Sequence, residues 1–343
     1  SLSSLPPVPP HAEPLLPSGH TVAHKQIAVI ENPACGNAVV MTGKHKKLKM
    51  TEDKQANLIV VENNTFTVSF DKSTGLMRHY AVNGTKMLGE GGTVRPNFWR
   101  AVTDNDMGAQ INKTYAKWCA PEMKLLSLDA IKGKKNEAPA IIIAKYELPA
   151  IGAQLSMTYS IANSGQITIE EKMTAGDKDK DSEMFRYGMV MELPYDMDRS
   201  EYYGRGPIEN YTDRKLSQNI GLYKQTADEQ FYPYVRPQET GTKSDIRWWN
   251  QCNGAGVGFK VTSDKPFYCS ALHYAVEDLD DGERKEQRHV QDVPKSKFTN
   301  LYLDSEHAGV GGIDSWSGNA RALPEYRVHY NDKTFKVVIT PNL

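Results

Sequence analysis

The chain has 343 residues, enough for about two ordinary domains or one unusually large β domain. Its 41 Lys and Arg residues nearly balance its 42 Asp and Glu residues, so no global field attracts nucleic acid or an anionic membrane. No stretch approaches the roughly 20 apolar residues that span a bilayer, so we expect a soluble protein without nucleic-acid or membrane partners.

The first 55 residues are expected to form a lead-in to the main domain. Residues 1–19 are rich in proline, which predicts an extended segment, and residues 20–31 alternate in polarity, which predicts one strand. Residues 41–57 are charged and turn-rich and predict a solvated linker. The chain begins with Ser and shows no signal peptide, so we expect a fragment of a longer protein, and its compartment stays open.

From residue 57 onward the sequence predicts successive hairpins. The three clearest pair residues 59–61 with 66–70, 155–161 with 167–173, and 326–330 with 335–339. Helices are predicted only at residues 113–119 and 275–288, the second because acidic residues precede basic ones. Many short strands separated by turn residues predict a large antiparallel sandwich or barrel.

Cysteine and histidine spacing argues against several kinds of site. The four cysteines, Cys35, Cys119, Cys252 and Cys269, lie far apart without a CxxC pair, so we expect free or buried thiols. No HExxH or GxSxG motif is present, so metal-hydrolase and serine-hydrolase hypotheses have no support.

A first polar cluster lies in the stretch RPNFWRAVTDNDMGA at residues 95–109. Asp104, Asn105 and Asp106 precede Gly108. Carboxylates two residues apart point to opposite faces of a strand, so they act together only in a loop, as metal ligands or as a hydrogen-bonding frame for the backbone. We favour the frame.

Two further stretches are interpreted as structural elements. The stretch EYYGRGPIENYTDR at residues 201–214 lacks the GxGxxG spacing of phosphate-binding loops and predicts a tight turn that exposes Arg205, Glu209 and Asn210. The pair Trp248-Trp249 is interpreted as core or edge packing.

The stretch AGVGGIDSWSGNA at residues 308–320 is different in kind. Its glycines, Asp314 and serines indicate a flexible polar loop, and Trp316 has few apolar neighbours that would bury it. An exposed indole is a natural platform for a sugar, because the CH groups of one pyranose face pack on the ring while hydroxyls find polar partners.

Four stretches together resemble the C-terminal region of the large bacterial β-galactosidases of glycoside hydrolase family 2. They are RAVTDNDMG at residues 100–108, YYGRGPIENYTDR at 202–214, YPYVRPQETGTKSDIRWW at 232–249 and GVGGIDSWS at 309–317, in the family's order and spacing. Residues 17–29 also look like the last strand of the immunoglobulin-like domain that precedes this region in those enzymes. Residues 1–55 would then be a lead-in, a remnant strand and a linker.

The resemblance implies an all-β fold for residues 56–343, a large antiparallel β-sandwich of the galactose-mutarotase-like type. The parent is expected to be a retaining β-galactosidase that hydrolyses terminal β-D-galactosides such as lactose. Its two catalytic carboxylates would lie in a (β/α)₈ barrel outside this chain. We therefore assign no catalytic residue and no metal ligand here, and we expect this fragment to be inactive alone.

The resemblance also implies partners and cofactors. We expect a galactoside substrate, the remaining domains of the parent, and a homo-oligomer of the parent. No cofactor is expected in this fragment, whereas the parent is expected to use Mg and Na bound mostly by other domains.

The resemblance assigns roles to particular residues. Trp316 matches the tryptophan on which sugar and aglycone stack, and the segment that begins at Gly108 matches a loop that moves when galactose binds. Glycine suits such a hinge because it has no Cβ. Two positions depart from the family's pattern. Val102 stands where some relatives have Pro, and Ile313 stands where Asp is common. The candidate substrate-binding residues are Trp316, Gly108, Asp104, Asn105 and Asp314.

Other classes of function stay open from the sequence. The chain could be a carbohydrate-binding module that holds a galactoside on Trp316 without chemistry. It could also be an aldose epimerase, which needs a His and Glu pair facing a groove, and the sequence offers no such motif. The plainest alternative is an assembly surface of the parent.

Overall fold

The computed structural model describes residues 23–29, 47–133, 139–178, 182–284 and 288–342. Contacts divide the chain into two units, Ser1–Ala34 and Cys35–Leu343. In the first unit, residues 23–29 are exposed and form no strand, so this part of the strand predicted at residues 20–31 is wrong. A strand needs ladder hydrogen bonds to a neighbour, which alternating polarity alone does not supply. The proline-rich lead-in at residues 1–19 and Cys35 lie outside the described residues.

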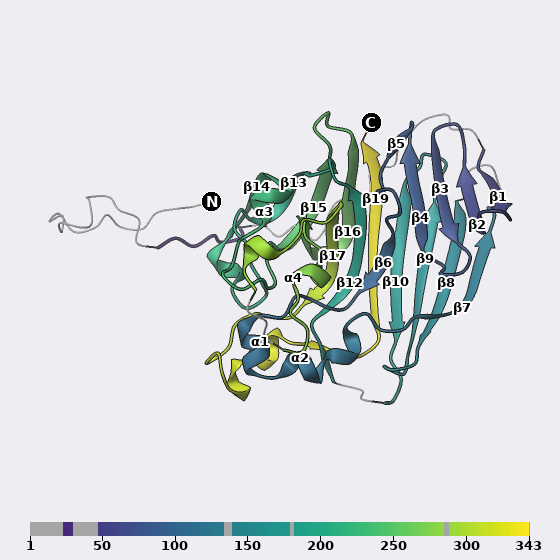
Figure 1. Ribbon diagram of the computed structural model, residues 1–343. Helices are drawn as coiled ribbons and strands as arrows, with labels where there is room; N and C mark the ends of the chain where they lie inside the picture. Colours follow the sequence, from purple (N-terminus) through teal and green to yellow (C-terminus); the bar gives the residue numbers. More distant parts are fainter. Residues whose placement is uncertain (1–22, 30–46, 134–138, 179–181, 285–287, 343) are drawn as a thin grey trace. The chain divides into compact units, whose positions relative to one another are not determined.

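The second unit is an antiparallel β-sandwich in which pairings join 17 strands into one curled sheet (Figure 1). One layer consists of β14 (Asn219–Thr226), β13 (Arg199–Gly206), β15 (Lys243–Cys252), β16 (Gly258–Leu272), β19 (Lys333–Asn342), β10 (Ile167–Thr174), β9 (Ala153–Ile161), β8 (Ala140–Leu148) and β7 (Lys124–Ile131). The other consists of β1 (Lys49–Asp53), β2 (Leu58–Glu62), β3 (Phe66–Asp71), β4 (Met77–Val82), β6 (Val94–Asn97), β12 (Arg186–Pro194) and β17 (Phe298–His307), with β5 (Thr85–Lys86) beside β4.

The two layers are joined through the long strand β16. Its residues 258–263 pair with β19, whereas residues 268–272 pair with β17 of the other layer. Side chains of both layers meet in one core, where the Phe70 ring of β3 contacts the Tyr159 ring of β9 with centroids 4.8 Å apart. The predicted all-β, antiparallel sandwich is therefore confirmed.

Two of the predicted hairpins are confirmed. Strands β2 and β3 pair from Leu58↔Asp71 to Glu62↔Thr67, and β9 and β10 pair from Ile161↔Ile167 to Gln154↔Thr174. Along β9, every second side chain is buried, as the alternation predicted.

The predicted C-terminal hairpin is wrong. Strand β18 (Val328–His329) pairs with β11 (Glu183–Met184) in a separate small sheet, and β19 pairs with β10 and β16. Alternation shows which face of a strand is buried but does not identify its partner. Tyr330, which lies between β18 and β19 in the sequence, is buried, and its ring centroid is 5.3 Å from that of Trp118.

The linker predicted at residues 41–57 also needs correction. Residues 49–53 form β1, which pairs with β2 from Lys49↔Glu62 to Asp53↔Leu58, so the sandwich begins before residue 56. Four of its five residues are exposed, and charged side chains are common on edge strands because they discourage further pairing. The composition of an edge strand therefore resembled that of a linker. Residues 30–46 lie outside the described part.

The helices are short. They are α1 (Asp104–Gly108), α2 (Ile111–Thr114), α3 (Ala227–Gln230) and α4 (Val276–Leu279), with 3₁₀ turns at Ala116–Trp118, Lys215–Ser217, Val290–Asp292, Gly318–Ala320 and Pro324–Tyr326. Residues 113–119 are mostly helical, as predicted. Within the described residues, the helix predicted at residues 275–288 is present only as α4, because the backbone is extended at Asp280 (φ −83°, ψ 133°) and Gly282 has a positive φ of 74°. Residues 285–287 lie outside the described part. Among the described residues, no helix is long and apolar enough to cross a membrane.

Candidate functional site

Helix α1 carries the predicted Asp104-Asn105-Asp106 cluster, and a capping box fixes its start. The Asp106 backbone N–H donates to Thr103 Oγ1 (3.1 Å), and the Thr103 N–H donates to Asp106 Oδ2 (2.9 Å). The same carboxylate receives two hydrogen bonds from the buried Arg100 guanidinium, at 3.1 and 2.8 Å. Asp106 is therefore part of a frame, as the sequence suggested.

Asp104 joins α1 to a second loop. Its Oδ1 accepts a hydrogen bond from Arg236 Nε (2.9 Å), and its Oδ2 accepts one from Gln238 Nε2 (3.3 Å). Arg236 also donates to Val102 O (2.8 Å) and to the buried carboxylate of Asp281 (2.9 Å). Arg236 lies in the stretch at residues 232–249 that carries part of the family resemblance, and its hydrogen bonds join α1 to the loop after α4.

Gly108, at the end of α1, touches the segment that carries Trp316. A Cβ built on Gly108 would lie 2.2 Å from Ser315 O and 3.0 Å from Trp316 Cα, both backbone atoms. Two segments that are far apart in the sequence are thus in contact, and Figure 1 shows α1 beside the yellow segment that precedes β18.

The loop at residues 308–320 presents the Trp316 indole, which is 80% exposed. Asp314 Oδ1 accepts hydrogen bonds from the backbone N–H groups of Trp316 (3.1 Å) and Ser317 (3.0 Å), and its Oδ2 accepts one from Ser317 Oγ (2.6 Å). The Ser317 hydrogen bond lowers the pKa of the Asp314 carboxyl. Asp314 therefore shapes the turn beneath the indole.

These segments line an open cavity of about 520 Å³, here called the Trp316 cavity. Its lining residues are Asp104, Met107, Gly108, Gln110, Asn112, Lys113, Glu283, Ser315 and Trp316. The volume lies within the roughly 300–1,000 Å³ of small-molecule sites. Of the predicted residues, Trp316, Gly108 and Asp104 line this cavity, whereas Asn105 and Asp314 are outside its lining.

Four further polar residues of the lining were not among those predicted from the sequence. Gln110, Asn112 and Lys113 follow directly after Gly108, and Glu283 comes from the loop after α4. Asn112 Nδ2 donates to Gly282 O (3.4 Å) and Glu283 O (3.2 Å), which joins the two segments. Gln110, Asn112 and Lys113 belong to the segment that begins at Gly108 and is predicted to move. That prediction could therefore have identified them.

We expect Gly108→Ala to displace the Trp316 segment. The new methyl group would overlap the Ser315 carbonyl, so backbone must shift, at a cost of about 1–3 kcal/mol in unfolding free energy. Gly318→Ala is the matched control, because its Cβ would have no neighbour within 4 Å. Chemical denaturation and the Trp316 indole N–H resonance report the two effects. An unchanged resonance in Gly108→Ala would contradict this arrangement.

A His and Glu pair lies in the interior of the same unit. His307 Nε2 is 3.7 Å from Glu239 Oε1, and Arg186 Nη1 is 3.7 Å from Glu239 Oε2. Burial alone would raise the Glu239 pKa, but the nearby His307 side chain and the Arg186 charge lower it to about 2. Both side chains are buried, so the pair does not face a groove as an epimerase would require.

The described residues offer little to a metal ion. Within them, no three His, Cys, Asp or Glu side chains gather in a way that could hold one. Cys119 is exposed, Cys252 is partly exposed and Cys269 is buried, and all three are free thiols.

The chain is similar in sequence to one known protein family and to longer curated proteins. The family described as "Beta galactosidase small chain" matches residues 62–339. The β-galactosidase of Priestia megaterium is 32% identical over 318 residues, which are 92% of this chain and 29% of the relative. That of Vibrio cholerae is 31% identical over 269 residues, 75% of this chain and 24% of the relative. The chain thus spans less than a third of the length of these relatives.

Solved structures with similar folds include two aldose-epimerase-type proteins. The galactose 1-epimerase of Lactobacillus acidophilus NCFM shares 8% identity over 87% of this chain and 99% of that chain, with a TM-score of 0.46. A putative aldose 1-epimerase of Escherichia coli K12 shares 8% identity over 86% of this chain and 99% of that chain, with a TM-score of 0.42.

Proposed function

Since this chain belongs to the β-galactosidase small-chain family, we propose that it forms the substrate-contacting but non-catalytic C-terminal part of a retaining β-galactosidase. The remaining part of the parent, corresponding to the rest of its longer relatives, would supply the catalytic carboxylates and any Mg and Na. Its partners would be a galactoside, those other domains and further copies of the parent.

The exposed Trp316 indole at the edge of a cavity is the observation that carries this proposal. A large aromatic ring that is 80% exposed gains little from burial within its own chain. The apolar face of a galactose ring or an aglycone can cover it, while the polar side chains of Asp104, Asn112 and Lys113 lie in the same lining for hydroxyl groups.

The second part of the proposal is that the segment after Gly108 adjusts when the sugar binds. Gln110 adopts φ 59°, a left-handed conformation, directly before α2. The Gly108 contact with Ser315 links any movement of this segment to the position of Trp316. Closing of the loop would then change the stacking surface and the polar lining together.

Lactose titration followed by NMR tests the binding site. We expect saturable shifts of the Gly108 amide and Trp316 indole resonances, while the indole of Trp248, packed under Lys260 at 4.4 Å, stays unchanged. Stacking contributes about 0.5–1.5 kcal/mol. Trp316→Ala should therefore raise the lactose concentration for half-maximal Gly108 shift roughly two- to tenfold. Equal titration curves for both proteins would refute the role of Trp316.

Turnover tests the non-catalytic half of the proposal. We expect the purified chain to leave p-nitrophenyl β-D-galactoside unhydrolysed, because no residue of this chain is assigned the role of catalytic acid/base or of nucleophile. Absorbance of released p-nitrophenol is the measurement, with the same preparation of the Asp106→Ala variant as a purification control. Hydrolysis that co-purifies with the folded chain would overturn the assignment.

A further inference from the structure

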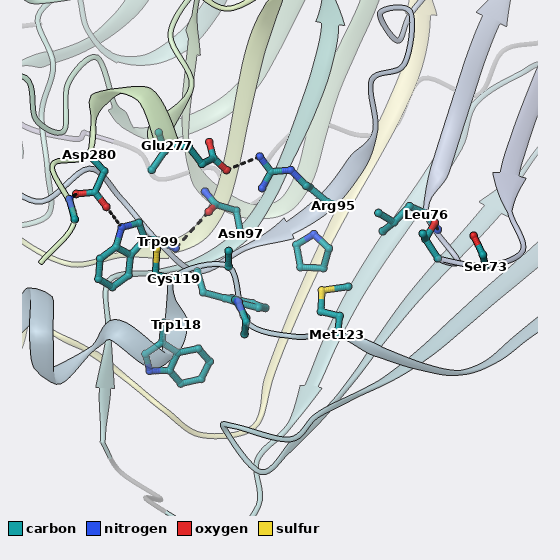
Figure 2. Close-up of a pocket in the computed structure, with 17 residues that line it drawn as sticks. Ser73, Leu76, Arg95, Asn97, Trp99, Trp118, Cys119, Met123, Glu277 and Asp280 are labelled. Carbon is teal, nitrogen blue, oxygen red and sulfur yellow. Dashed lines mark hydrogen bonds and ion pairs between the residues drawn. The ribbon is translucent and has the colours of Figure 1, made fainter. Parts of the chain in front are cut away.

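A second cavity, of about 510 Å³, borders the loop after α4 (Figure 2). It is here called the Trp99 cavity. Gly282 is part of its lining, and the next residue, Glu283, is part of the lining of the Trp316 cavity. The two cavities are therefore separated by one short stretch of backbone.

The base of the Trp99 cavity is aromatic. Phe98, Trp99 and Trp118 are all buried, and the Phe98 and Trp118 rings lie edge to face with centroids 5.6 Å apart. Pro96 and Met123 extend the apolar wall. Figure 2 shows Trp118 beneath the polar groups of Arg95, Glu277 and Asp280. The three rings are only 2%, 6% and 0% exposed, so the apolar surface that the cavity offers to a ligand comes mainly from the partly exposed Leu76, Pro121 and Met123.

A buried amide lies between this apolar base and the polar rim. Asn97 is only 7% exposed, and its Oδ1 accepts a hydrogen bond from the Trp99 backbone N–H (3.3 Å), which fixes the orientation of the amide. No acceptor for its Nδ2 exists among the described residues. Figure 2 places the amide between Trp99 and the ion pair of Arg95 with Glu277. Buried donors are almost always paired, so an occupant of this cavity should offer an oxygen acceptor.

The charged groups of the lining already have partners. Arg95 Nη2 is 2.8 Å from Glu277 Oε1, and Asp280 Oδ2 accepts a hydrogen bond from Trp99 Nε1 (2.6 Å). One guanidinium faces two carboxylates, so the local charge is negative and repels anions such as phosphorylated sugars. A neutral ligand with acceptor oxygens meets these conditions.

We propose that the Trp99 cavity binds a neutral saccharide, whose pyranose CH groups pack on this apolar wall while one of its oxygens accepts a hydrogen bond from Asn97 Nδ2. Both an apolar face and several acceptor oxygens belong to every neutral pyranose. This site does not depend on Trp316, and it would give the chain a second place to hold a sugar.

Protection of Cys119 tests the proposal on the whole chain. Cys119 is exposed and belongs to the lining, and burial together with the Asp280 and Glu277 carboxylates raises its pKa to about 11, so alkylation is followed at pH 9. In a chain with Cys35→Ser and Cys252→Ser, methyl β-D-galactoside, lactose and methyl glucosides are added in turn. We expect at least one to slow alkylation at least threefold in a saturable way, and to shift the Trp99 indole resonance.

Variants separate the two cavities. Trp316→Ala should keep the protection of Cys119, whereas Asn97→Leu, which removes the donor, should lose it. Because Asn97 is buried and its replacement can affect folding, Cys119→Phe in the Trp316→Ala chain provides an independent test. There the added ring fills the cavity, and calorimetric binding of the sugar should disappear.

Four results would overturn the proposal. They are absence of protection with every sugar, loss of protection in Trp316→Ala, protection by p-nitrophenol or galactose 6-phosphate but by no neutral sugar, and sugar binding that survives Cys119→Phe. None of them bears on the shift of the Trp316 resonance, so this proposal and the proposed function fail separately.

Discussion

Replacing Asp106 with alanine is expected to lower the free energy of unfolding by about 3–5 kcal/mol. The carboxylate receives hydrogen bonds from two nitrogen atoms of Arg100, and the two side chains are only 4% and 1% exposed. The substitution leaves a buried guanidinium without its counter-charge and removes one end of the capping box at Thr103. Breaking a buried pair costs far more than removing a surface pair of the same geometry, because the remaining charge cannot be rehydrated.

The same substitution should also impair the Trp316 cavity. Arg100 Nη1 donates to Ala308 O (2.8 Å) and Arg100 Nη2 to Gly309 O (3.0 Å), where the loop that carries Trp316 begins. Asp106 therefore holds the guanidinium that joins α1 to this loop. We expect the lactose-dependent shift of the Gly108 amide to need a higher concentration in Asp106→Ala.

Urea denaturation measures the first effect. Asp106→Asn, which keeps one acceptor oxygen, should be intermediate between wild type and Asp106→Ala. Asp129→Ala on the exposed edge strand β7 is the control, and it should change stability by less than about 0.5 kcal/mol. Equal stability of Asp106→Ala and Asp129→Ala would show that the buried pair of Asp106 and Arg100 does not stabilise the fold.

Local features of the fold could be predicted, because they depend on neighbouring residues. The hairpin of β9 and β10 follows from alternation on both sides of a Gly165 turn, whose φ is 83°. Exposure of Trp316 followed from the scarcity of apolar neighbours in its loop. In both cases, a single continuous stretch of the sequence holds the information.

Features that depend on distant segments could not be predicted. Strand β19 takes β10 and β16 as partners, and no local pattern distinguishes these from other strands. The Trp316 cavity needs α1, α2, the loop after α4 and the loop at residues 308–320 to meet. Only the resemblance to a known family put the first and last of these into one site, and it did not include Glu283.

Glu171 is a buried acidic residue of β10, and its burial was not predicted from the sequence. It is one of the inward-facing residues of β10. The other three, Ile167, Ile169 and Met173, are apolar. Its side chain is fully buried, and neither carboxyl oxygen has a hydrogen-bond partner among the described residues. Burial, with a smaller effect of the Asp304 charge, raises the pKa of Glu171 well above its ordinary value.

This raised pKa makes stability depend on pH. Between the ordinary glutamate pKa, about 4.3, and the raised value, the folded chain keeps a proton on Glu171 that the unfolded chain releases. The folded state then binds more protons than the unfolded state, so the free energy of unfolding falls as pH rises, by up to about 1.4 kcal/mol per pH unit. The contribution of a protonated Glu171 is complete below pH 4 and is lost progressively above it.

Glu171→Gln should remove this loss, because the amide has nearly the same shape as the carboxyl group but no proton to release. We expect the variant to gain stability relative to wild type as pH rises from 5 to 8. Glu170→Gln is the matched control, since the neighbouring side chain is partly exposed on the opposite face of β10. Its stability difference from wild type should stay nearly constant with pH. Denaturation midpoints across this range distinguish the outcomes, and a Glu171→Gln difference that is independent of pH would show that Glu171 ionises inside the folded chain as readily as in water.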